Sequence, residues 1–198
     1  MFLGAFVGIF AAVLLLSAVQ DTEGDPTVIH AIGDWFSTLT TSEETRLSQL
    51  ESVTQAKVRE LLSRMRDQGV VIWVGQTLRT SAQEAANIEA GKTAGGLIHS
   101  WHELARAVDL YPTLPSGSPD YNATNLDNYR AMHEQAVNLG FRSLAFNSDG
   151  SKRLLTNSKG KKIWDGGHIE WRAPYDSIAQ AWEAEGVQAW EAEGDPVA

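Results

Sequence analysis

Residues 97–112 read LIHSWHELARAVDLYP and place two histidines, one glutamate and one aspartate within eleven positions. On a continuous helix, His102 and Asp109 would share a face but stand about 10.5 Å apart along the axis, and on a straight strand about 23 Å apart. Neither arrangement lets both side chains bind one metal ion. If they share a metal, the chain must turn between them near Ala105, and AVDLY must leave the turn as a strand that presents Asp109. Hydrophobic periodicity would also allow a helix here, so the pattern leaves both possibilities open.

The composition excludes several kinds of site. The 198-residue chain is long enough for one domain with a substantial core and short appendages. Cysteine is absent, which excludes disulfides, thiolate zinc sites and a cysteine nucleophile, so any metal must be held by His, Asp or Glu. The chain has 16 Lys and Arg against 25 Asp and Glu, a formal net charge of -9, without an evident basic cluster. Because this charge would repel a phosphate backbone, we expect no nucleic-acid partner.

The N-terminus is apolar. Residues 2–19, FLGAFVGIFAAVLLLSAV, carry no charge over 18 positions, which is the lower edge of what spans a bilayer. A signal peptide would normally have a basic residue before the apolar run, and a buried core helix of this length would normally show a polar face. We predict that residues 1–20 are a signal peptide or a signal-anchor helix. The rest of the chain is then expected to be exported, into the periplasm or tethered to the cytoplasmic membrane through residues 2–19.

The order of the remaining elements favours an α+β domain, with a small antiparallel sheet and helices packed on it. Helical spacing of apolar residues predicts helices, and runs of β-branched and aromatic residues predict strands. Residues 21–42 show little periodicity and are expected to form a linker, followed by the domain at residues 43–178. The helices are expected at 43–69, as one or as two shorter ones, within 79–91 and at 126–140, and the strands at 70–78 and as short segments within 141–171.

The C-terminal residues 179–198 contain a duplication, because QAWEAEG at 180–186 recurs at 188–194. Residues eight positions apart on a helix point in directions that differ by about 80 degrees, so the two tryptophans would not share a face of one helix. We expect a solvated acidic tail, with a docking segment as the alternative.

Three short motifs together resemble one known family. SWHELARAVD at 100–109 resembles the S-x-H-x-x-G-x-A-x-D signature of zinc peptidases that cut peptidoglycan stem peptides. This is the D-alanyl-D-alanine carboxypeptidase and L-alanyl-D-glutamate endopeptidase superfamily, which includes VanY-like enzymes and phage endolysins. WDGGHIEW at 164–171 resembles the family's D/E-x-x-H element, and TLRTSAQE at 77–84 resembles its arginine-bearing turn. The motifs occur in family order over about residues 45–176, and the set is more specific than any one of them.

The resemblance implies roles for six residues and a zinc site at one end of the sheet. It implies that one Zn²⁺ is held by His102, Asp109 and His168. It further implies that Asp165 is the general base, that Arg79 steadies the developing oxyanion, and that Ser100 supports the site or contacts the substrate.

The residue types are suited to this chemistry. Two histidines and one carboxylate suit Zn²⁺ and lower the pKa of bound water. Asp165 lies three residues before His168 across Gly166-Gly167, a flexible pair that could bring its carboxylate to the water without making it a ligand. Arg79 follows directly after the predicted strand, where a fixed cation could stabilise a tetrahedral oxyanion.

Several positions depart from the family pattern. Ala105 stands where the family usually has glycine, so the turn must be made without a left-handed residue or with slight strain. Gln83-Glu84 stands where the family commonly has Glu-Gln, so neither role transfers. His99 and Glu103 fall outside the signature and are expected not to be ligands. The two remaining histidines are expected to be plain surface residues: His30 and His133.

The function implied by the resemblance is hydrolysis of an amide bond in the stem peptide of peptidoglycan, by an endolysin-like L-alanyl-D-glutamate endopeptidase that faces the cell wall. The sequence does not determine the oligomeric state, for which we expect a monomer. One alternative is a D,D-carboxypeptidase that releases terminal D-Ala, which would share the metal site. Another is an inactive zinc-containing wall-binding module, against which the presence of Asp165 counts. A third is a membrane-active protein of the holin type that acts through residues 2–19.

Overall fold

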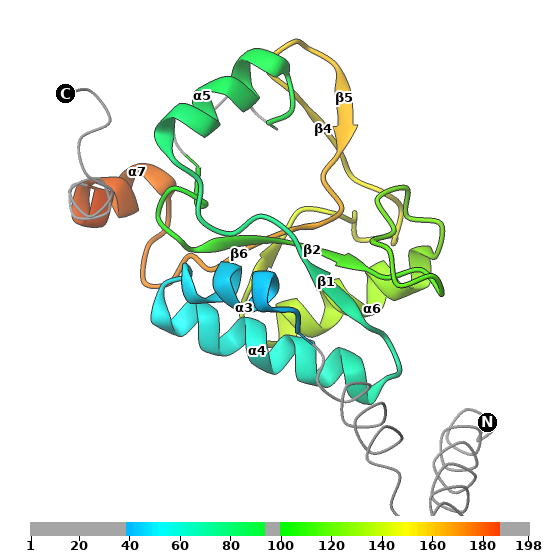
Figure 1. Ribbon diagram of the computed structural model, residues 1–198. Coiled ribbons are helices and arrows are strands. Elements are labelled where there is room, and N and C mark those ends of the chain that lie inside the picture. Colours follow the sequence, from blue (N-terminus) through cyan, green and yellow to red (C-terminus); the bar gives the residue numbers. More distant parts are fainter. Residues whose placement is uncertain (1–38, 94–99, 187–198) are drawn as a thin grey trace, which may run out of the picture. The chain divides into compact units, whose positions relative to one another are not determined.

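The computed structural model describes residues 39–93 and 100–186, which form helices around a small antiparallel sheet (Figure 1). This arrangement agrees with the predicted α+β class. The hydrophobic segment predicted at residues 1–20 and nearly all of the predicted linker lie outside the described residues. No helix within the described ranges has both the length and the apolar character needed to cross a bilayer.

The four-stranded sheet has the order β1-β2-β6-β3, and each neighbouring pair is antiparallel. Its strands are β1 (Ile72–Val74), β2 (Ala107–Pro112), β6 (His168–Glu170) and β3 (Arg142–Ser143). The predicted strand at 70–78 is therefore regular over three residues only. Past its end, the chain still follows β2, because the Gly75 N–H donates to the Asp109 carbonyl at 2.7 Å and the Asp109 N–H to the Gln76 carbonyl at 2.8 Å.

The central strand β2 divides its side chains between two faces. Val108 and Leu110 are fully buried, whereas Asp109 and Tyr111 alternate with them and line a cavity on the opposite face. Successive residues of a strand point to opposite sides, so this alternation sets one face for the core and the other for polar groups. Asp109 lies directly opposite His168 in the register of β2 and β6, so both side chains project from the same face.

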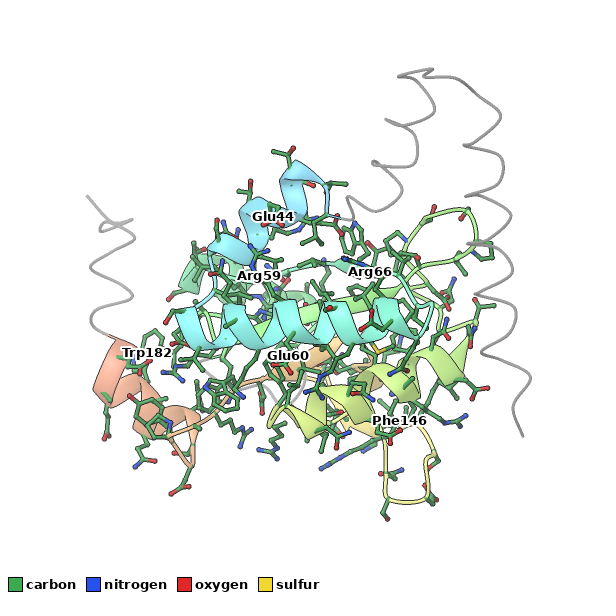
Figure 2. The ribbon with its side chains drawn as sticks, turned by 90° about the horizontal axis from the view of Figure 1, so that it is seen from below. Glu44, Arg59, Glu60, Arg66, Phe146 and Trp182 are labelled. Atoms are coloured by element: carbon green, nitrogen blue, oxygen red, sulfur yellow. The ribbon has the colours of Figure 1, made fainter. Side chains whose placement is uncertain are left out.

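Three helices cover the core face of the sheet (Figure 1). They are α3 (Thr41–Ser48), α4 (Ser52–Asp67) and α6 (Leu126–Asn138). Figure 2, seen from below, shows α4 in front of the sheet and beside α6, with Glu44 labelled on α3 and Arg59 labelled between α3 and α4. Of the two alternatives predicted for residues 43–69, the structure has the pair of helices. The second begins where the Glu51 carboxylate accepts the backbone N–H groups of Val53 and Thr54.

The opposite side of the sheet carries α5 (Ser81–Ala90) and the two-stranded sheet of β4 (Leu154–Thr156) and β5 (Lys162–Trp164) (Figure 1). A capping box formed by Thr80 and Gln83 starts α5, and Gly91, with a φ of 71°, ends it as predicted. The turn between β4 and β5 holds the end of this helix, since the Ser158 hydroxyl donates to the Ile88 carbonyl at 2.5 Å.

Part of the predicted acidic tail packs on the domain. Residues 178–186 form α7 (Ile178–Ala181) and a π-helical turn, η1 (Trp182–Gly186), in which Figure 2 labels Trp182. Ala181 is fully buried in a cluster with Trp101, Leu104 and Ala107. The Glu185 carboxylate accepts two hydrogen bonds from the buried Arg106 guanidinium, at 2.9 and 2.8 Å. The second QAWEAEG copy lies outside the described residues.

Candidate metal centre

A turn separates His102 from Asp109. After Ser100 the chain forms consecutive turns, in which the Ala105 N–H donates to the His102 carbonyl at 3.1 Å and the Arg106 N–H to the Trp101 carbonyl at 2.9 Å. Ala105 has a φ of 55°, the left-handed conformation that glycine adopts at least cost. Ala105, which stands where the family usually has glycine, therefore adopts a strained backbone conformation. After this turn, β2 begins and presents Asp109.

Three side chains converge at the end of this turn. His102 Nε2 and His168 Nδ1 lie 3.2 Å apart, and each lies 3.3 Å from Asp109 Oδ1. Ligands bound tetrahedrally to Zn²⁺ at 2.0–2.2 Å stand roughly 3.3 Å from one another. The spacing of these atoms therefore fits a zinc ion, and the structure brings together the ligand set that the resemblance implied.

The second nitrogen of each histidine is held by a neighbouring oxygen. His102 Nδ1 lies 2.6 Å from the Thr77 carbonyl, and His168 Nε2 lies 3.2 Å from a Glu170 carboxylate oxygen. Because a carbonyl can only accept a hydrogen bond, Nδ1 of His102 carries a proton, and Nε2 is the nitrogen left to bind a metal ion. In each ring one nitrogen is thus held by an oxygen and the other is turned toward the centre, as in metal sites whose ligands are oriented by outer oxygens.

Glu170 was not identified from the sequence. It is buried, receives a 2.7 Å hydrogen bond from Arg172 Nε and faces His168 from the same strand. A signal was available, because residues two apart on a strand share a face, and Glu170 follows His168 at that spacing.

Arg79 lies at the edge of the centre, where it is fixed by two neighbours. It forms an ion pair with the buried Glu84 at 2.5 Å, and the Gln76 side-chain oxygen accepts hydrogen bonds from its Nε and Nη2 at 3.2 and 2.8 Å. Its Nη2 lies 3.9 Å from Asp109 Oδ2. The ambiguity at Gln83-Glu84 is resolved, since Glu84 pairs with Arg79 whereas Gln83 caps α5.

Asp165 lines the same cavity as the three candidate ligands. The cavity has a volume of about 500 Å³, and Arg79 and Ser100 also line it. Burial raises the pKa of the Asp165 carboxyl, and the Asp109 charge adds to this, while His168, His102 and Arg79 oppose it. A carboxylate with a raised pKa is a better proton acceptor near neutral pH.

Asp109 is affected in the opposite direction. Burial by itself would raise its pKa, but the charges and hydrogen bonds of His102 and His168 hold the pKa of this carboxyl well below its usual range. The pKa values of two carboxyl groups in one cavity are thus moved in opposite directions. The lowered pKa keeps Asp109 ionised, as a metal ligand must be, and the raised pKa suits Asp165 to accept a proton.

Ser100 and Glu103 stabilise the turn that carries His102. The Ser100 hydroxyl accepts a hydrogen bond from the His102 N–H at 3.3 Å, and the Ser100 N–H donates to a Glu103 carboxylate oxygen at 2.6 Å. The other oxygen of Glu103 accepts from the Ser81 hydroxyl at 2.8 Å, which ties the turn to α5. Glu103 therefore lies outside the cluster of candidate ligands. His99 falls outside the described residues.

The prediction of a surface position for His133 is wrong. Its side chain is only 4% exposed, because the face of α6 that carries Tyr129, Met132 and Ala136 packs inward. His133 Nε2 lies 2.7 Å from the Gly166 carbonyl, and the Ser143 hydroxyl lies 2.8 Å from Nδ1. Burial lowers the pKa of His133 to about 4. The helical spacing to Tyr129 and Ala136 was a signal that could have placed it on the buried face.

No family model matches the chain. The chain is 28% identical over 95 residues to an L-alanyl-D-glutamate peptidase of Listeria phage A118, a match that covers 48% of this chain and 33% of the phage protein. It thus spans about a third of that relative's length. The solved structure of L-Ala D-Glu endopeptidase ChiX from Serratia marcescens aligns with a TM-score of 0.47 and 20% identity, over 67% of this chain and 87% of that one. The similarity to the phage peptidase confirms the resemblance to the superfamily of D-alanyl-D-alanine carboxypeptidases and L-alanyl-D-glutamate endopeptidases.

Proposed function

We propose that this protein is a zinc-dependent peptidase that hydrolyses an amide bond in the stem peptide of peptidoglycan, as an L-alanyl-D-glutamate endopeptidase. The observation that carries the proposal is the convergence of His102 Nε2, Asp109 Oδ1 and His168 Nδ1 at tetrahedral spacing in a cavity that also holds Asp165. The similarity to a phage peptidase of that activity supports the choice of bond.

The proposed reaction requires one water and one proton acceptor. A zinc ion bound to the three candidate ligands would supply a Lewis acid and lower the pKa of water. Asp165 takes a proton from the attacking water as the oxygen of that water bonds to the carbonyl carbon of the substrate. Asp165 then delivers that proton to the nitrogen as the carbon–nitrogen bond breaks, which leaves a free amine and a carboxylic acid that loses its own proton to solvent.

Arg79 contributes a fixed positive charge. Glu84 and Gln76 hold the guanidinium in one orientation beside Asp109, so it needs little rearrangement when negative charge develops on the carbonyl oxygen. Preorganised charge of this kind lowers the barrier because the protein has already been arranged around the transition state. Ser100 contributes by fixing the backbone of His102 at the rim of the cavity.

The location of the activity is part of the proposal. Residues 1–20 would direct export, either as a cleaved signal or as an anchor, and residues 41–186 would then meet peptidoglycan from the periplasmic side. The apolar and uncharged run at 2–19 supports this placement.

The test is digestion of purified peptidoglycan with and without a chelator, followed by identification of the new termini by mass spectrometry. New C-terminal L-Ala together with N-terminal D-Glu is the expected result, and the chelator should abolish it. Release of free D-Ala would instead identify the D,D-carboxypeptidase. Absence of cleavage by folded, zinc-loaded protein would contradict both activities and leave the wall-binding module.

A further inference from the structure

The turn that joins Asp165 to His168 has no side chains of its own to hold it. Its two middle residues are Gly166 and Gly167, and packing rather than a left-handed φ excludes larger residues. A Cβ on Gly166 would overlap the Trp164 ring, and one on Gly167 would lie 2.8 Å from the Tyr111 ring. Such distances are far inside van der Waals contact. The orientation of this turn must therefore be set by groups from outside it.

Two hydrogen bonds supply that restraint. The Gly167 carbonyl accepts the Leu110 N–H at 2.9 Å, which continues the pairing of β2 and β6. The Gly166 carbonyl accepts the His133 Nε2–H at 2.7 Å, from a side chain on α6. The first bond belongs to the sheet and would form with any residues, whereas the second depends on one particular side chain.

His133 is itself held in one orientation. Because the Gly166 carbonyl can only accept, Nε2 carries the proton, and Nδ1 is then free to accept the Ser143 hydroxyl of β3 at 2.8 Å. The Phe146 ring packs edge-on against the imidazole, with centroids 5.5 Å apart. Both ring nitrogens are satisfied in a buried site, so rotation of the ring would break two hydrogen bonds at once.

We propose that His133 is a positioning residue of the metal centre, which acts through the Gly166 carbonyl to orient Asp165 and His168 toward the same point. The catalytic part of this inference rests on the proposed function. Loss of the donor would leave a buried carbonyl without a hydrogen-bond partner, and the turn would rotate to find another one. A shift of about 1 Å in a catalytic group can lower the rate by about 100-fold.

The test compares three substitutions of the same residue. His133→Gln keeps an amide donor at about the reach of Nε2, His133→Asn keeps an amide but places it near Nδ1, and His133→Leu removes the donor at similar bulk. We expect Asn and Leu to weaken zinc binding by about 10- to 100-fold and to lower kcat on the order of 100-fold, with KM within about threefold of the wild-type value. We expect His133→Gln to recover most of both losses.

The measurements are zinc affinity by competition with a chromophoric chelator, kcat and KM on a purified muropeptide, and amide hydrogen exchange of Gly167 and His168 in the metal-free protein. Exchange should be faster in the Asn variant than in the Gln variant. This comparison of two amides keeps the test valid where the Leu variant fails to fold.

Two results would overturn the inference. One is a folded Asn variant with wild-type zinc affinity and exchange, and the other is a Gln variant as impaired as the Asn variant. A wild-type protein that binds zinc but cleaves no peptidoglycan would contradict the proposed function instead, while zinc affinity and hydrogen exchange would still decide the role of His133.

Discussion

Two turns build the candidate metal centre, and they are formed in different ways. The turn at residues 100–106 carries His102 and reverses the chain with Ala105 at a φ of 55°, although alanine is unfavourable there. The turn at residues 165–168 joins Asp165 to His168 through two glycines that are required because there is no space for a Cβ. Glycine is thus absent where backbone conformation favours it and present where packing demands it.

The two turns also differ in what holds them. The first is held by its own side chains, since Glu103 binds Ser81 and the Ser100 N–H, and Arg106 binds Glu185 of the C-terminal segment. The second has no such side chains in its middle and is held from α6 and β2. The first turn should therefore tolerate backbone changes better than the second, and four predictions test this difference.

The largest effect is expected from the side chains that the turns present. Asp165→Asn should lower kcat by about 100- to 10,000-fold with zinc still bound, because the amide cannot accept the proton of the attacking water. His102→Ala should lose the metal, because it removes one of three candidate ligands. Turnover and zinc content, measured on both variants, check the assignment. An Asp165→Asn protein with full activity would show that another group is the base.

The second prediction concerns His133, which holds the turn at residues 165–168 from outside through the Gly166 carbonyl. The pKa of His133 is lowered to about 4, so the folded state prefers the neutral ring and the unfolded state takes up a proton first as the pH falls. The stabilisation is present above pH ~6.5, and about 3 kcal/mol of it is lost as the pH falls from ~6.5 to ~4. Urea unfolding of the metal-free protein at both ends of this range measures the loss.

His133→Gln supplies the control for this pH dependence, because glutamine does not titrate. The variant should lose about 3 kcal/mol less than the wild type over the same range. Equal losses in the two proteins would mean that other groups cause the acid sensitivity.

The third prediction separates packing from conformation at the glycines. Gly166→Ala should destabilise the fold by about 1–3 kcal/mol and weaken zinc binding, because the new Cβ must displace the Trp164 ring, whose Nε1 donates to the Ala145 carbonyl at 2.7 Å. Gly160→Ala, at a φ of 75° in open space, should cost about 1–2 kcal/mol and leave zinc affinity unchanged. Thermal unfolding and chelator competition distinguish the two, and unchanged zinc affinity in Gly166→Ala would contradict the prediction.

The smallest effect is expected at Ala105. Ala105→Gly relieves about 1–2 kcal/mol of left-handed strain but gives the unfolded chain more freedom, which offsets about 0.4–1 kcal/mol. The free energy of unfolding should rise by up to about 1 kcal/mol, with zinc affinity unchanged. Ala123→Gly, at a φ of 50° outside the cavity, is the matched control. A lower melting temperature for Ala105→Gly would show that the alanine side chain contributes to packing.

Much of the fold and of the candidate site follows from local patterns. The helix ends near Gly69 and Gly91 reflect capping, and the alternation of buried and cavity-facing side chains along β2 reflects the period of two in a strand. Both depend on neighbouring residues only. The packing of the C-terminal segment was harder to predict, because Glu185 binds Arg106, which lies 79 residues away in the sequence.

The chemistry available to a metal site follows from the residue types alone, since without cysteine we expect only His, Asp and Glu to hold a metal, and the three motifs single out His102, Asp109 and His168. The way in which those residues are held depends on the folded chain: on the left-handed Ala105, the pairing of Arg79 with Glu84, the contact of Glu170 with His168, and the burial of His133. The physical reason is that ligand type is a property of single side chains, whereas orientation depends on hydrogen bonds between segments that become neighbours only when the sheet and its helices pack.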